Sequence, residues 1–293
     1  MCYDGFKARI IDLPIDKMKN NLDFTCVMSP KTGVQYGSYD LMRLYKDSDS
    51  KYSLNLKIYE SGNSFVNGSI HKFWQNVNSN LFTLKDCQQA FKILFEAMEC
   101  NADKANFTNL EIGVNVIVDF NPDLFLNRII SYKGKAFKPM GKAENSFGLV
   151  CETAEYDLKI YNKSREYNLP FGVLRIEKKI TDSKFLKRNL IKNISDALEE
   201  KNVRLLLSDL SKSFDEVLYD DITIDEEYLT TMQKIALSKY RNPKYWLKPN
   251  MSKGERRNSK NRFRDYIKKY GSETYRNEIK ENFNIAVEKI LTL

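Results

Sequence analysis

The chain has a single histidine, His71, among its 293 residues. This excludes sites that need two histidines, such as the His-hydrophobe-His metal pair, the HExxH zinc motif and multi-histidine metal centres. The nucleotide-binding loops GxxxxGK[ST] and GxGxxG are also missing, so the sequence gives no case for a P-loop ATPase or a dinucleotide enzyme. A metal in this protein would need mainly oxygen ligands, which suit Mg²⁺ or Mn²⁺.

Long apolar stretches and cysteine pairs are missing as well. No apolar run approaches 18 residues, and the first residues lack the apolar core of a signal peptide. The five cysteines are odd in number, widely spaced and never arranged as CxxC, which fits reduced thiols and neither disulfides nor a zinc site. With 42% hydrophobic and 29% charged residues, the composition is globular. These features predict a cytoplasmic protein that does not enter a membrane.

The net charge of +8 is concentrated in one part of the chain. Residues 241–269 contain eleven basic side chains but only two acidic ones, so the rest of the chain is close to neutral. Local clustering of cations is what a polyanion-binding surface requires. We therefore expect a nucleic-acid contact in this segment, made by residues that include Lys253, Arg256, Arg257, Lys260, Arg262 and Arg264.

Apolar periodicity predicts an α+β fold with a largely antiparallel sheet, helices on one of its faces and a helical C-terminal part. A helix is expected after Thr83, which forms a capping box with Asp86. From residue 181 onward the strand signal fades, which places a domain boundary near residue 182 and predicts domains 1–181 and 182–293. The expected strands cover 7–13, 24–28, 54–59, 65–74, 110–119, 135–139 and 147–151, and a short helix is expected over 122–132.

Residues 156–179 carry the signature of a β-hairpin, with two alternating runs joined by a turn-rich connection. Residues two apart in a strand share a face, so one face is apolar and the other is polar. The polar face is predicted to present Lys159, Tyr161, Lys163, Arg175, Glu177 and Lys179. A hydroxyl nucleophile, a carboxylate metal ligand and several cations are the groups that phosphodiester chemistry uses. A solvated, charge-paired sheet face is the alternative interpretation.

A carboxylate metal site is expected where the polar faces of two strands meet. Glu111 lies on the polar face of the strand predicted over 110–119, and Glu177 lies on that of the hairpin. Both are candidate ligands, with His71 as a third. The neighbouring Lys72 and the hairpin cations Arg175 and Lys179 are candidate DNA contacts.

Four segments, in this order and spacing, resemble a known family: NGSIHKFW, LEIGVN, YDLKIYNKSREY and VLRIEKK. They are similar to the replication initiation proteins of phages and plasmids of the filamentous-phage gene II type and, more distantly, to the Rep_trans initiators of rolling-circle plasmids. The resemblance covers roughly residues 50–250. It implies a tyrosine-dependent enzyme that nicks one DNA strand at an origin, holds the 5′ phosphate on tyrosine, and needs a divalent metal held by carboxylates.

Carried over by position, Glu111 corresponds to the acidic strand residue, Tyr161 and Lys163 to the IYxK motif, and Glu177 to the following glutamate. The resemblance implies single- and double-stranded origin DNA as the partner in a bacterial cytoplasm. It also suggests contacts with a host helicase and polymerase, and leaves a homodimer open.

The nucleophile is not fixed by the sequence. In Rep_trans initiators the nicking tyrosine precedes the IYDK motif by about a dozen residues, where this chain has Phe147 and Gly148. Tyr161 is favoured because it shares a face with Lys159 and Lys163, and nearby cations are expected to lower the pKa of a phenol. Tyr156 is the second candidate. An origin-binding protein that does not nick, or a protein with no nucleic-acid role, remains an alternative.

Overall fold

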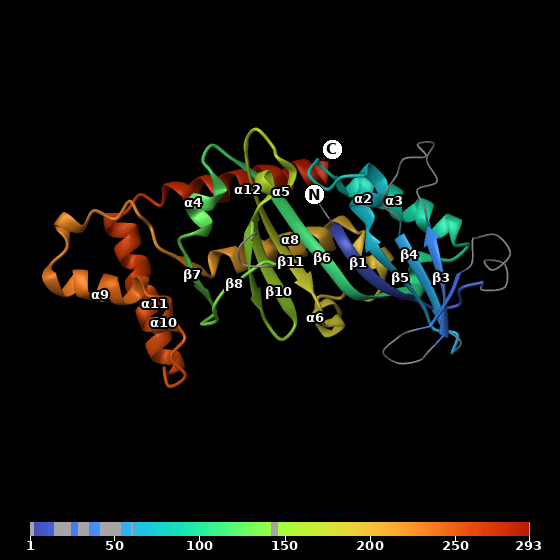
Figure 1. The fold of residues 1–293 in the computed structure, drawn as a ribbon, viewed down its shortest axis with the longest axis horizontal. Coiled ribbons are helices and arrows are strands. Elements are labelled where there is room, and N and C mark those ends of the chain that lie inside the picture. Colours follow the sequence, from blue (N-terminus) through green and yellow to red (C-terminus); the bar gives the residue numbers. More distant parts are fainter. Residues whose placement is uncertain are drawn as a thin grey trace.

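The computed structural model describes residues 3–14, 25–28, 35–41, 54–59, 61–141 and 146–292. A ten-stranded sheet forms its centre, and all neighbouring strands in it are antiparallel (Figure 1). Its spatial order is β2-β3-β4-β5-β1-β6-β11-β10-β9-β8. The strands are β1 (Tyr3–Ile10), β2 (Thr25–Met28), β3 (Gln35–Leu41), β4 (Leu54–Tyr59), β5 (Ser64–Ser69), β6 (Ala105–Val118), β8 (Lys138–Pro139), β9 (Gly148–Glu152), β10 (Tyr156–Asn162) and β11 (Gly172–Ile180); β7 (Ile129–Tyr132) and β12 (Val217–Tyr219) form a separate pair.

Helices cover one face of the sheet, as the sequence predicts (Figure 1). Alternating residues of β6 and β11 are fully buried against these helices, and each such aliphatic side chain contributes about 1.5–3 kcal/mol. No helix within the described ranges is long and apolar enough to cross a bilayer. The elements on this side include α3 (Leu84–Ala97), α6 (Ser183–Arg188), α7 (Ile194–Ala197), α8 (Glu200–Asp215) and α12 (Thr274–Thr292).

The strand expected over 135–139 is only β8, and β3 and β12 were not predicted. Two further elements differ in type or length from the sequence prediction. The strand expected over 65–74 ends at Ser69, because the Ser69 hydroxyl accepts a hydrogen bond from the Lys72 backbone N–H at 3.1 Å and caps helix α2 (Ile70–Gln75). His71 therefore lies in a helix and not in a strand. The helix expected over 122–132 is only α4 (Pro122–Leu126), and the chain then enters β7.

The buried apolar residues of the described part of the chain form two separate cores. The first joins the sheet with the helices on its covered face, including several that follow residue 182. The second holds Trp246 and Phe263 among its buried side chains and lies beyond the β8 edge of the sheet (Figure 1). Its helices are α9 (Thr231–Arg241), α10 (Pro243–Trp246) and α11 (Lys253–Tyr270). The division into two domains at residue 182 stays a prediction.

Candidate active site on the open face of the sheet

The hairpin of β10 and β11 has the register that brings its polar residues together. Lys159 pairs with Glu177 and Tyr161 with Arg175, while Leu158 and Ile160 enter the helix-covered core. On the other side of β11, Lys179 pairs with Glu111 of β6. The alternation therefore places these polar side chains on the face opposite the helices, as the sequence predicts.

Three carboxylates meet on the central strands. Asp4, Glu111 and Glu177 each offer an oxygen, and these oxygens all lie within 4.8 Å of one another. Glu111 and Glu177 are therefore close enough to share one ion, as the sequence predicts. Asp4 is an addition that sequence reasoning missed. A register shift in β1 between Tyr3 and Phe6 inserts a residue at this point, and such a bulge redirects side chains.

Cations hold this cluster together. The ammonium of Lys159 lies 2.7 Å from Glu177 and 3.4 Å from Glu111, and that of Lys179 lies 3.2 Å from Glu111. Burial alone would lower the pKa of Lys159, but the two glutamates outweigh burial and raise it. Burial would raise the pKa of Glu177, but Arg175 and Lys159 outweigh burial and lower it. Both groups therefore remain charged at neutral pH.

Arg175 is fully buried beneath the cluster. Its Nε donates to Glu177 at 2.7 Å and its Nη1 donates to the Asn115 side chain at 3.0 Å. Gly113 makes room for it, because a Cβ at this position would lie 2.8 Å from Arg175 Nη2. The sequence predicts Arg175 as a DNA contact, but its burial gives it the different task of orienting Glu177.

Tyr161 borders the cluster with its phenol. Its Oη lies 3.5 Å from Glu177 Oε2, and its ring packs edge-on against Phe147 with centroids 5.8 Å apart. Gly148 lies against it, and a Cβ there would meet Tyr161 Cβ at 2.0 Å. Burial raises the pKa of Tyr161 well above its usual value, and Arg175 offsets only part of this rise. The expectation that nearby cations lower this pKa was therefore wrong, because desolvation dominates.

Lys163 approaches Tyr161 from a short helix and not from the strand. It is the first residue of α5 (Lys163–Tyr167), and its ammonium donates to Asn78 at 2.9 Å and to Glu166 at 2.8 Å. It also lies 5.4 Å from the centre of the Tyr161 ring. Asn78 in turn donates to Asp4 at 2.7 Å, so a continuous network links Lys163 with the carboxylates.

Tyr156 lies on the other face of the sheet, away from the carboxylates. Its hydroxyl contacts that of Tyr132 at 2.8 Å and accepts a hydrogen bond from Lys133 at 3.0 Å. The ammonium of Lys178 lies 4.3 Å from the centre of its ring, and Lys178 itself pairs with Asp209 of α8. A regular strand puts Tyr156 here, with the helix-covered core.

His71 is outside the carboxylate group. Its ring stacks on Phe82 with centroids 4.5 Å apart, and its Nε2 contacts Gln75 at 2.9 Å. Burial lowers its pKa to about 4. The structure therefore does not bring it together with Glu111 and Glu177 as a third ligand, and Lys72 follows it as a half-buried residue of α2.

A polar cleft of about 490 Å³ adjoins Glu111 on the open face. Lys7, Lys57 and Lys179 supply positive charge to its lining, while Tyr59 and Phe65 supply aromatic surface. The Lys7 ammonium lies 5.0 Å from the centre of the Phe65 ring. Cations interleaved with aromatic rings suit a single-stranded nucleic acid, whose phosphates and bases they can hold separately. Sequence reasoning missed this cleft because its residues come from strands far apart in the chain.

The predicted C-terminal DNA contacts lie in different surroundings along α11. Lys253, Arg256, Arg257 and Lys260 line a cavity at the N-terminal half of α11. Lys260 pairs with Glu216, and Arg264 donates to the Asp215 carbonyl, so both tie α11 to the end of α8. Arg262 is exposed.

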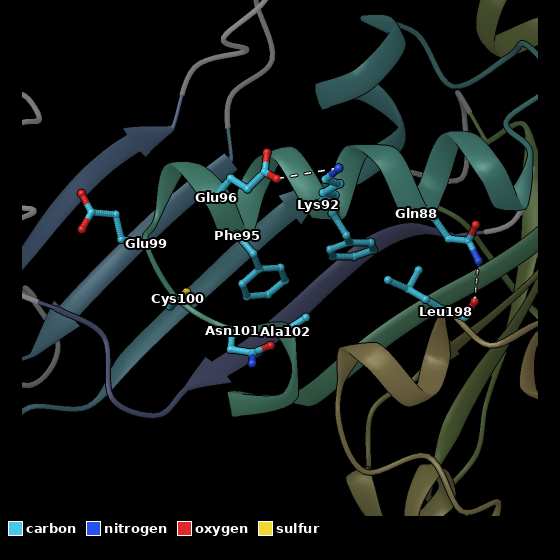
Figure 2. A pocket seen from close by; sticks show the side chains of 10 residues that line it. Gln88, Lys92, Phe95, Glu96, Glu99, Cys100, Asn101, Ala102 and Leu198 are labelled. Atoms are coloured by element: carbon cyan, nitrogen blue, oxygen red, sulfur yellow. Dashed lines mark hydrogen bonds and ion pairs between the residues drawn. The ribbon is translucent and has the colours of Figure 1, made fainter.

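A third hollow, of about 630 Å³, runs along α3 on the helical side of the sheet (Figure 2). Figure 2 shows Lys92 directed toward Glu96 and Gln88 bonded to the Leu198 carbonyl. The first pair is 3.9 Å apart and the hydrogen bond is 3.0 Å long. Its lining is largely apolar and includes Phe95. It has no part in the carboxylate cluster.

No protein-family model matches the chain, and no curated protein sequence matches it. Among solved structures, a rolling-circle replication initiator protein from Geobacillus stearothermophilus is similar, with a TM-score of 0.41 and 11% sequence identity. The similarity covers 80% of this chain and 89% of that one.

Proposed function

We propose that this protein is a replication initiator of the rolling-circle type, which nicks one DNA strand at an origin and retains the 5′ phosphate on a tyrosine. The observation that carries the proposal is the constellation on the open face: three carboxylates, the cations that hold them and the phenol of Tyr161, beside a cationic, aromatic cleft. The order of the sequence motifs supports the same activity.

The carboxylate cluster suits a divalent cation. Asp4, Glu111 and Glu177 offer only oxygen ligands, which Mg²⁺ and Mn²⁺ prefer, and their spacing is compatible with one ion. Such an ion would polarise a phosphate. Lys159 lies between two of these carboxylates and must give up part of its contact when a cation binds.

The chain's own residues account for the remaining chemistry. Tyr161 Oη would attack the phosphorus, forming a phosphotyrosine bond while the bond to the 3′ oxygen breaks. Glu177 Oε2 lies nearest the phenol among the carboxylates and would accept its proton. That proton would then pass to the leaving 3′ oxygen, which departs as a hydroxyl. Lys159 would stabilise negative charge on the transferring phosphate. Arg175 is a positioning residue, because it contacts Glu177 from below.

DNA would reach Tyr161 from the side of the open cleft. Tyr161 is only 6% exposed, so the attack requires the Phe147 ring that packs on it to move. Lys7, Lys57 and Lys179 would hold the phosphates of the approaching strand. The exposed cations of α11 would contribute a second, sequence-independent contact to duplex DNA.

Two observations favour a second function. The raised pKa of the buried Tyr161, together with phenylalanine at position 147, fits an initiator that binds origin DNA and leaves nicking to another enzyme.

Incubation with supercoiled plasmid that carries the origin of its own replicon separates these functions. Conversion to the nicked circle with Mg²⁺ or Mn²⁺, and none with EDTA, is the expected result. Retention of the plasmid without nicking would support the second function, and absence of both would contradict both. An unrelated supercoiled plasmid serves as the control for sequence-specific cleavage.

A further inference from the structure

A cavity of about 380 Å³ lies between α11 and the turn that follows β7. Its volume falls at the lower end of the range of about 300–1,000 Å³ typical of small-molecule sites. Leu218, Trp246 and Met251 give it apolar walls. Five cationic side chains and one carboxylate complete the lining: Lys133, Lys253, Arg256, Arg257, Lys260 and Glu216.

The turn beneath this cavity is built at a conformational cost. Lys133 has φ +49° and Gly134 has φ +74°, and the backbones of Tyr132 and Lys135 exchange two hydrogen bonds of 3.0 and 2.9 Å across them. This is a two-residue hairpin turn with both central residues left-handed, where asparagine and glycine are favoured at the first position. A lysine there is strained, and strained residues cluster at ligand sites.

Arg256 closes the cavity from the helix. Its guanidinium lies directly on Gly134, since a Cβ on that glycine would be 2.0 Å from Arg256 Nη1. Its Nε is buried and, among the described residues, has no hydrogen-bond partner. A buried donor without an acceptor is destabilising, and a bound anion that accepts from it would remove this cost. Glu216 cannot neutralise the site, because it already pairs with Lys260.

We propose that this cavity binds a nucleoside phosphate, with the phosphate on Lys133 and Arg256 and the base against the apolar wall. The excess of cations selects a polyanion, and Arg256 offers a donor that suits phosphate. The apolar wall suits a flat base, whereas inorganic phosphate has no apolar part that could contact it. The nucleotide is either free in solution or part of a single DNA strand. This site is independent of the carboxylate cluster and of nicking.

The test is calorimetric titration of the full chain, without metal, with a deoxynucleoside diphosphate, with a short single-stranded oligonucleotide and with inorganic phosphate. Lys133→Gly removes the cation and relaxes the turn, but it also removes the hydrogen bond to Tyr156, so its melting temperature is compared with that of the wild type. Arg256→Gln removes the second cation. Both variants should weaken nucleotide binding at least tenfold. Arg188→Gln changes an exposed arginine of α6, outside both the cavity and the proposed DNA contacts, and should leave nucleotide binding unaltered.

Saturable binding of the free nucleotide supports a solution ligand, and binding of the oligonucleotide alone supports a nucleotide of DNA. Inorganic phosphate binding as tightly as either would overturn the proposal, because the base would then contribute nothing. Binding that Lys133→Gly and Arg256→Gln leave unchanged would also overturn it, as would no binding by either nucleotide form. These binding measurements do not depend on nicking activity. Failure of the proposed nicking function and failure of the nucleotide site are therefore distinguishable.

Discussion

Replacing Arg175 by methionine tests the buried charge network most sharply. The guanidinium is fully buried, donates to Glu177 at 2.7 Å and to Asn115 at 3.0 Å, and lies 3.6 Å from Asp4. Methionine is similar in length and keeps most of the packing, so the change removes mainly the charge and its hydrogen bonds. Glu177 then stays buried with the ammonium of Lys159 and the hydroxyl of Tyr161 beside it.

Removing one partner of a buried ion pair costs about 3–5 kcal/mol. Because Lys159 still neutralises Glu177, we expect the lower end, about 3 kcal/mol. For a chain of this size each kcal/mol shifts the melting temperature by about 2–4 °C, so Arg175→Met should lower it by about 6–12 °C. Thermal unfolding followed by circular dichroism, supported by urea titration, measures both quantities.

Two controls accompany this variant. Arg188→Met removes an arginine whose side chain is 58% exposed and pairs with Glu155, so it should change the melting temperature little. The double variant Arg175→Met/Glu177→Met removes both charges and should recover much of the loss. If Arg175→Met is no more harmful than Arg188→Met, the buried network does not stabilise Glu177.

Three further predictions concern His71, the cations beside the carboxylates, and α11. The pKa of His71 falls from about 6.5 in the unfolded chain to about 4 on folding, so its contribution to stability is complete above pH 6.5 and declines by about 3 kcal/mol toward pH 4. His71→Gln should remove this pH dependence of the free energy of unfolding in urea titrations. An unchanged pH dependence would contradict the prediction. Lys159→Met frees the oxygens of Glu111 and Glu177 and should raise Mn²⁺ affinity at least tenfold by calorimetry. Lys179→Met removes an ion pair with Glu111 and should have the smaller effect. Equal effects would count against a cation site between the two glutamates. Arg257→Ala, an exposed change on α11, should reduce the salt dependence of DNA binding by about one released counterion, because one phosphate is no longer neutralised. An unaltered dependence of the binding constant on salt concentration would exclude Arg257 from the DNA interface.

Local sequence patterns predicted the parts of the fold that depend on neighbouring residues. Alternation along 156–179 predicted which hairpin side chains share a face, and Lys159, Tyr161 and Glu177 do lie together. The capping box of Thr83 and Asp86 predicted the start of α3. These features could be predicted because each depends on residues only a few positions apart in the sequence.

Features set by distant segments could not be predicted. Asp4 reaches the carboxylates because β1 lies between β5 and β6 and carries a bulge, neither of which leaves a local signal. The burial of Arg175 depends on Gly113 and Asn115 of another strand. The strand prediction beyond Ser69 was wrong, because Ile70, Phe73 and Trp74 have the spacing of one helix face and Ser69 caps the helix that contains them.

A covalent adduct on Tyr161 is the most direct test of tyrosine-dependent nicking. Wild-type protein incubated with a 3′-labelled origin oligonucleotide should carry the labelled downstream strand through denaturing electrophoresis, and the labelled peptide should contain Tyr161. Tyr161→Phe removes only the nucleophilic oxygen, so it should abolish the adduct while melting temperature and origin binding stay close to wild type. Tyr156→Phe, on the opposite face of the sheet, is the matched control and should retain the adduct. An adduct that survives Tyr161→Phe and disappears in Tyr156→Phe would contradict the assignment, and an adduct in the double variant would remove both tyrosines from the chemistry.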